Sequence, residues 1–154
     1  MKYLLIVFVI FLALAPLSHF IPSKHQRKVA RLRERAAVDG LFVEFRKTPE
    51  DSRGEKLGNG PLIFYGKRLP PGRGPRIQHT VFVLDDWGWR GLNRAAEALP
   101  VLTGLPAGIT LAAQDDGTCG VFWNEEGDEA ELQQIVAVLE EWTRQLRPAR
   151  GEIS

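Results

Sequence analysis

Few side chains in this 154-residue chain could carry nucleophilic chemistry. Cys119 is the only cysteine, and His79 is the only histidine beyond residue 38. A histidine within hydrogen-bonding reach activates a cysteine, and these two residues fall in two predicted strands. A Cys119–His79 dyad is therefore one interpretation, and a small buried cysteine with an unrelated strand histidine is the other. No local motif supports the dyad, so the sequence predicts no catalytic residue.

Other catalytic and ligand-binding patterns are equally sparse. None of the four serines lies in a Gly-x-Ser-x-Gly elbow. Gly72-Arg73-Gly74 lacks the Lys-Ser/Thr of a phosphate-binding loop. The sequence therefore predicts no bound cofactor and a protein that is not an enzyme. An enzyme that acts on membrane substrates through Asp85, Asp86 or His79 is a further alternative.

The sequence contains no suitable set of metal ligands either. One cysteine and one histidine cannot build an ordinary zinc site. Five acids lie close together in the sequence, but their spacing differs from that of a calcium loop: Glu125, Glu126, Asp128, Glu129 and Glu131. Acids are favoured at a helix N-terminus for electrostatic reasons alone. We therefore predict no metal site, and we interpret these acids as the start of a helix.

Two tryptophans lie one residue apart in the segment Asp85-Asp86-Trp87-Gly88-Trp89-Arg90. Tryptophan and arginine dominate the energetics of protein interfaces. Trp87, Trp89 and Arg90 are therefore a candidate protein-binding surface. The alternative is that one tryptophan closes the core and the other shields its edge.

Positive charge is concentrated near the N-terminus, although the net charge of the chain is only +1. Residues 23–38 carry one acid, Glu34, while from residue 39 onward 13 Lys and Arg face 18 Asp and Glu. Such a distribution suits anionic lipid headgroups and not a nucleic acid, which binds a basic folded domain. The predicted lipid contacts are the six cations Lys24, Arg27, Lys28, Arg31, Arg33 and Arg35. A solvated linker that serves only as a topology signal is the other interpretation.

The segment before these cations, residues 3–21, contains no charged residue. Nineteen helical residues would span about 28 Å, close to the thickness of a bilayer core. The sequence predicts a transmembrane helix here, in a single-pass protein of the bacterial inner membrane. The positive-inside rule then puts the N-terminus outside and the following domain in the cytoplasm. A cleaved signal peptide is one alternative, since Ala13-Leu14-Ala15 matches a small-x-small cleavage site, and a buried core helix is the other.

Residues 23–38 are predicted to form a basic helix that links the span to a domain over residues 39–150. Ser23 can cap this helix, and Asp39-Gly40 can end it. The domain is predicted to be α+β, with a sheet of about five strands and two helices on one side. The expected strands cover residues 41–46, 62–69, 77–84, 109–114 and 119–124, and the expected helices cover 92–99 and 128–146. Residues 85–89 are expected to form a turn.

A single N-terminal apolar segment ends at Pro22 and is followed by Gln26-Arg27-Lys28 in a basic helix and by a β segment that begins at Leu41. In these features the first 46 residues resemble the YajC family, the small accessory subunit of the bacterial preprotein translocase. The resemblance implies a single-pass inner-membrane protein that associates with the translocase. It does not extend to residues 48–150, and it transfers no functional residue.

These observations favour a binding or scaffolding function at a membrane, in an accessory subunit of a membrane complex such as the translocase. An exported or periplasmic-facing domain is the runner-up. The single cysteine excludes an intrachain disulfide, so the chain lacks the usual mark of an exported domain.

Overall fold

The computed structural model describes residues 1–51, 53–58, 60–72, 74–93 and 99–147. The chain divides into two compact units, Met1–Arg31 and Leu32–Ser154. The boundary between the two units falls inside a helix.

The N-terminal unit begins with α1, an α-helix over Lys2–Leu14, followed by a 3-10 helix, η1, over Ala15–Phe20. Pro16 lies in the first turn of η1. A proline has no backbone N–H to donate, and its ring clashes with the carbonyl four residues earlier. The α-helix therefore ends at Leu14, after only 13 residues.

This interruption corrects the prediction for the N-terminus. Thirteen helical residues extend about 20 Å, well short of the hydrocarbon thickness of about 30 Å. Nowhere in the described residues does a helix combine the length and the apolar character that crossing a bilayer requires. The transmembrane helix predicted over residues 3–21 is therefore wrong. The single-pass topology and the inner-membrane localisation that depend on it are wrong as well.

The second helix, α2, covers Lys24–Val38, and its ends are defined by hydrogen bonds. Ser23 Oγ accepts from the Gln26 N–H at 3.2 Å, and Gln26 Oε1 accepts from the Ser23 N–H at 2.9 Å, which is a reciprocal capping box. At the other end, the Leu41 N–H donates to the Ala36 carbonyl and the Gly40 N–H to the Ala37 carbonyl. Gly40 has a φ of 82°, as this Schellman motif requires.

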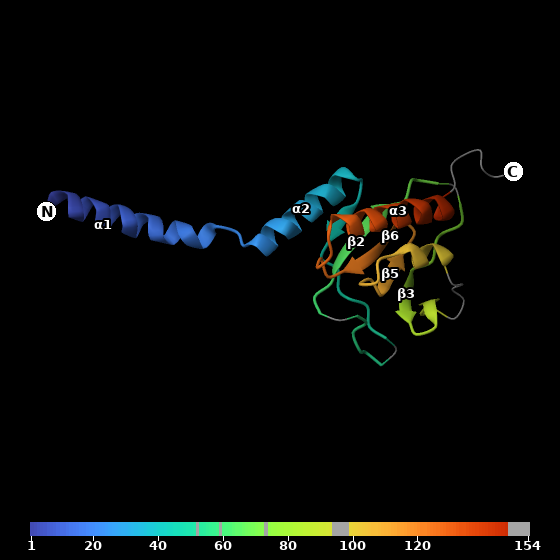
Figure 1. Ribbon diagram of the computed structural model, residues 1–154. Coiled ribbons are helices and arrows are strands. Elements are labelled where there is room, and N and C mark those ends of the chain that lie inside the picture. Colours follow the sequence, from blue (N-terminus) through green and yellow to red (C-terminus); the bar gives the residue numbers. More distant parts are fainter. Residues whose placement is uncertain (52, 59, 73, 94–98, 148–154) are drawn as a thin grey trace. The chain divides into compact units, whose positions relative to one another are not determined.

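A six-stranded, fully antiparallel sheet forms the centre of the second unit, in the order β1-β2-β6-β5-β3-β4 (Figure 1). The strands are β1 Phe42–Glu44, β2 Ile63–Arg68, β3 Thr80–Asp85, β4 Gly88–Gly91, β5 Leu111–Gln114 and β6 Thr118–Trp123. The α+β class is confirmed. The expected number of strands was one too low, because β4 lies partly in the segment expected to be a turn.

One face of the sheet carries the main core. Figure 1 shows α3, Glu129–Leu146, lying across this face. Asp128 caps α3 by accepting from the Glu131 N–H at 2.9 Å. The same core includes the 3-10 helix η2, Pro100–Gly104, through the buried Leu102, and α2 through Leu32 and Ala36. Of the helix expected over 92–99, residues 94–98 lie outside the described residues.

The other face of the sheet carries a smaller aromatic and aliphatic cluster that includes Phe64, Leu111 and Phe122. Leu57 and Leu62, from the long connection between β1 and β2, pack against it. Gly66 and Gly120 oppose each other across β2 and β6. A Cβ added at either glycine would collide with the Phe64 ring, so this pair of glycines provides the space that the ring occupies.

Candidate binding surfaces

Four of the six cations predicted to contact lipid lie together on the first half of α2. Lys24, Arg27, Lys28 and Arg31 line one shallow depression of the surface. Their spacing of three, four and seven residues places them on one side of a helix. We call these four residues the basic face.

Arg33, the fifth predicted cation, instead contacts the domain. Its Nε and Nη2 donate to the two carboxylate oxygens of Glu125 at 2.7 and 2.8 Å. The Tyr65 hydroxyl donates to Glu125 Oε1 at 2.6 Å. Glu125 is only 6% exposed and has a left-handed backbone, with a φ of 60°. The hydrogen bond to Glu125 raises the pKa of Arg33, while burial, followed by the Glu125 contact, raises that of Tyr65.

Arg35, the sixth predicted cation, likewise forms ion pairs within the domain. Its Nε lies 3.2 Å from Asp39 Oδ2 and 3.9 Å from Glu129 Oε1. Asp39 also accepts from the Gln133 side chain of α3 at 2.8 Å. The six cations therefore form two groups: four make up the basic face, and Arg33 and Arg35 connect α2 to the acids of the domain.

The α1 helix exposes apolar side chains all around its circumference. The least exposed of its large apolar side chains, Ile10, is still 51% exposed, and Tyr3 reaches 83%. Soluble proteins rarely expose a contiguous apolar surface of this extent, and such surfaces usually mark an interaction site. The N-terminal unit thus combines an exposed apolar helix with the basic face.

The three residues of the candidate protein interface, like the six cations, do not share one environment. Trp87, at the turn between β3 and β4, is 96% exposed. Trp89, on β4, is only 9% exposed and belongs to the main core. The Arg90 Nε donates to Asp85 Oδ2 at 2.5 Å. This hydrogen bond and the Trp87 N–H together lower the pKa of Asp85. Of the three predicted residues, only Trp87 is almost fully exposed to solvent.

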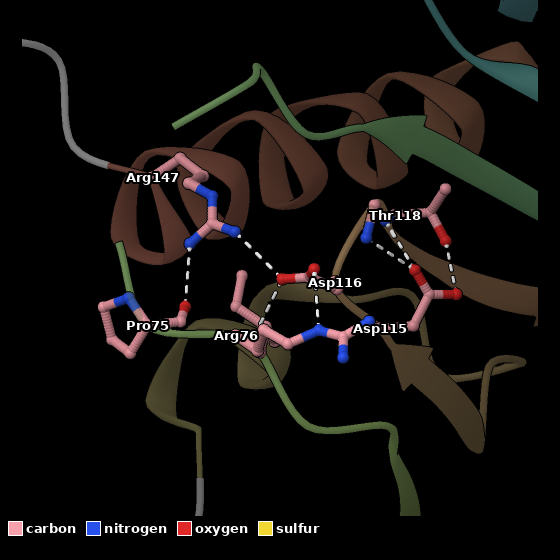
Figure 2. Close-up of polar contacts among 8 residues, drawn as sticks. Pro75, Arg76, Asp115, Asp116, Thr118 and Arg147 are labelled. Atoms are coloured by element: carbon pink, nitrogen blue, oxygen red, sulfur yellow. Dashed lines mark hydrogen bonds and ion pairs between the residues drawn. The ribbon is translucent and has the colours of Figure 1, made fainter. Parts of the chain in front are cut away.

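A polar cluster at the end of α3 connects three separate segments (Figure 2). Asp116, in the turn between β5 and β6, accepts from the Ile77 N–H at 3.0 Å and from Arg147 Nη2 at 3.1 Å. The Ile77 N–H, followed by the charges of Arg147 and Arg76, lowers the pKa of Asp116. The Arg147 side chain is 12% exposed and also donates to the Pro75 carbonyl at 3.4 Å. We assign this cluster a structural role, because its cation and carboxylate neutralise each other.

Sequence reasoning missed this use of Arg147. The local sequence indicates only a cation at the C-terminal end of a helix, where the helix dipole favours positive charge. Its partners are 31 and 72 residues away in the sequence, and no local pattern indicates them. The nearby glycines are a weak signal in hindsight, since a Cβ at Gly72 would lie 3.0 Å from the Arg147 side chain.

The structure does not support the Cys119–His79 dyad. Cys119 is fully buried on β6, whereas His79 is exposed just before β3, and β5 lies between these two strands. The Cys119 Sγ lies 3.5 Å from Thr143 Oγ1. Burial raises the pKa of the Cys119 thiol to about 11, so the thiol is neutral at physiological pH. A neutral, buried thiol is not a nucleophile.

Within the described ranges, no group of three or more His, Cys, Asp or Glu side chains is arranged to hold a metal ion. Glu125 pairs with Arg33, and Asp128 caps α3. Two of the five acids that begin at Glu125 are therefore used in packing and capping. Comparison of the chain with protein-family models, with curated proteins and with solved structures finds no match, so the resemblance of residues 1–46 to the YajC family stays a prediction.

Proposed function

We propose that the chain is a non-catalytic binding protein whose N-terminal unit contacts the surface of an anionic phospholipid bilayer. The basic face carries this proposal. Four cations on one side of a helix match a layer of phosphate groups, and each such cation near an anionic membrane contributes about 1 kcal/mol. The contact is with the lipid surface and requires no helix that spans the bilayer.

Two further observations support this assignment. Arg33 and Arg35 are paired with Glu125, Asp39 and Glu129 within the domain, whereas no carboxylate is found paired with Lys24 or Arg31 in the part of the chain that the structure describes. The exposed apolar side chains of α1 belong to the same compact unit. Apolar contact and electrostatic attraction to anionic lipids add to each other in surface binding. The α+β domain would then be held beside the bilayer as the binding or scaffolding part.

Vesicle flotation of the full chain tests the proposal. The test variant replaces Lys24, Arg27, Lys28 and Arg31 by glutamine. We expect it to bind vesicles rich in phosphatidylglycerol at least about tenfold more weakly than the native chain at low salt. Vesicles of phosphatidylcholine alone measure the apolar contribution of α1 separately, and there the two proteins should bind equally. High salt should reduce the difference on anionic vesicles.

A matched control removes the same number of positive charges elsewhere on the surface. Lys47, Arg53, Lys56 and Arg144 are exposed, and their replacement by glutamine should leave vesicle binding within about twofold of the native chain. The proposal fails if the control variant weakens binding as much as the variant of the basic face. It also fails if the variant of the basic face binds anionic vesicles as tightly as the native chain.

One observation favours a second candidate, an exported domain. The apolar part of α1, residues 3–14, falls within the roughly 7–15 residues of a signal-peptide apolar core. Met1-Lys2 precedes this core, and Ala13-Leu14-Ala15 provides the small residues of a cleavage site. N-terminal sequencing of the protein purified from its own cells distinguishes the two candidates. A mature chain that begins near Pro16 would establish export, whereas a chain that begins at the initiator methionine would exclude cleavage here.

A further inference from the structure

The turn between β3 and β4 is held in a defined shape by one carboxylate. Asp85 Oδ1 accepts from the Trp87 N–H at 2.9 Å, and Asp85 Oδ2 accepts from Arg90 Nε at 2.5 Å. Gly88, which pairs with Asp85 in the ladder, has a φ of 113°, a value that favours glycine. The two residues at the tip of the turn, Asp86 and Trp87, are therefore presented on a fixed backbone.

These two side chains are the parts of the turn that the fold does not use. Trp87 is 96% exposed. Asp86 is exposed, and its carboxylate has no hydrogen bond or ion pair to any residue that the structure describes. Arg90 does not neutralise Asp86, because its guanidinium is engaged by Asp85. The tip thus carries an exposed indole and, at the neighbouring position in the chain, a carboxylate that pairs with no residue of the described ranges.

We propose that Asp86 and Trp87 form a binding site for an arginine or lysine side chain on a partner protein. Tryptophan is the best aromatic partner for a cation, which is attracted to the face of the ring. The adjacent carboxylate adds charge attraction to the same ligand. Arginine fits better than lysine, because its planar guanidinium stacks on an aromatic face and is more weakly hydrated.

The chemistry of the tip disfavours other partners. An apolar pocket would accept the indole, but it would also desolvate the Asp86 carboxylate without a compensating partner. A nucleic acid would be repelled by Asp86. The excess of acids from residue 39 onward, 18 against 13 cations, favours the approach of a basic partner. Trp89 takes no part, because it is in the core. The site is in the second unit and does not depend on lipid binding by the basic face.

The test is a titration of the full chain, held in a non-ionic detergent, with a short glycine-rich peptide that contains arginine. The control peptide carries citrulline, a neutral isostere of arginine, at the same positions. The indole N–H resonance of Trp87 is identified from its loss in Trp87→Phe. We expect the arginine peptide to shift this resonance and the citrulline peptide to leave it unchanged. The proposal is overturned if the two peptides shift it equally, or if neither does.

Variants of the tip provide the second readout, measured as peptide affinity by calorimetry. Asp86→Asn should weaken binding of the arginine peptide at least threefold, and Trp87→Ala should abolish it. Because Trp87 is almost fully exposed, Trp87→Ala should keep the native circular dichroism spectrum. Arg144→Gln, which removes an exposed cation from α3, serves as the matched control, and it should bind at least as well as the native chain. Loss of affinity in Arg144→Gln, or native affinity in Trp87→Ala, would rule the site out.

Discussion

Replacement of Gly120 by alanine is expected to lower the free energy of unfolding by about 3 kcal/mol. The added Cβ would lie 2.5 Å from the Tyr65 carbonyl oxygen and 2.8 Å from the Gly66 Cα, and it would also collide with the Phe64 ring. Two of these three neighbours are backbone atoms of β2, the strand that pairs with β6. Backbone in the middle of a ladder cannot move aside without loss of hydrogen bonds, so the strain is retained in the folded state.

Urea unfolding followed by circular dichroism measures this effect. Gly108→Ala is the matched control, because an added Cβ there would have no neighbour within 4 Å and Gly108 does not have a positive φ. It should change stability by no more than about 1 kcal/mol. Equal stabilities of Gly120→Ala and the native chain would mean that β2 and β6 do not approach each other as described.

The second large effect is expected for Arg33→Met. This change leaves Glu125, which is 6% exposed, with Tyr65 as its remaining side-chain partner. Loss of one member of a buried ion pair costs about 3–5 kcal/mol. We expect the lower end, about 3 kcal/mol, because the Arg33 side chain is 35% exposed and solvent already screens part of the interaction. Urea unfolding measures the loss.

Two further variants show whether the lost ion pair is the cause. In Arg33→Met with Glu125→Gln, the amide is uncharged and its oxygen can still accept from the Tyr65 hydroxyl, so stability should be largely restored. Arg35→Met removes another cation from the same helix. The Arg35 side chain is 47% exposed, so this change should lower the free energy of unfolding by less than about 1 kcal/mol. If the double variant is less stable than Arg33→Met alone, the buried charge on Glu125 is not the source of the loss.

Regular local patterns predicted much of the domain. Five of the six strands were expected close to their observed positions, because alternating apolar residues bounded by glycine, proline and aspartate identify a strand. The long helix α3 was expected from its apolar face and its Asp128 cap. The strand β4 was missed because Gly88-Trp89-Arg90-Gly91 is short, contains two glycines and shows no alternation. Its partner β3 stabilises it as a strand, and a local pattern does not report that pairing.

The N-terminus was misjudged because apolar composition was given more weight than backbone chemistry. Residues 3–21 are apolar enough for a continuous span, but Pro16 ends the α-helical hydrogen bonding early. A proline between Ala15 and Leu17 was visible in the sequence, so the interruption could have been predicted.

The binding surfaces could be predicted only in part. Spacing identified six cations on one short segment, but it did not distinguish Arg33 from Arg31. That distinction depends on Glu125, which is 92 residues away from Arg33. The same limit applies to the two tryptophans. Residues two apart on a strand share a face, but Trp87 lies in the turn that precedes β4. Only the three-dimensional structure shows that one is exposed and the other is buried.

The strand order also determines when the domain can fold during synthesis. The strand β2 lies between β1 and β6, and β6 follows it by about 50 residues of chain. The main core further requires α3, which follows β6 in the chain. A growing chain on the ribosome therefore cannot complete this core until α3 has emerged. Residues 1–31 emerge before the domain, so the segment proposed to bind lipid is available to its target before the domain has acquired its structure.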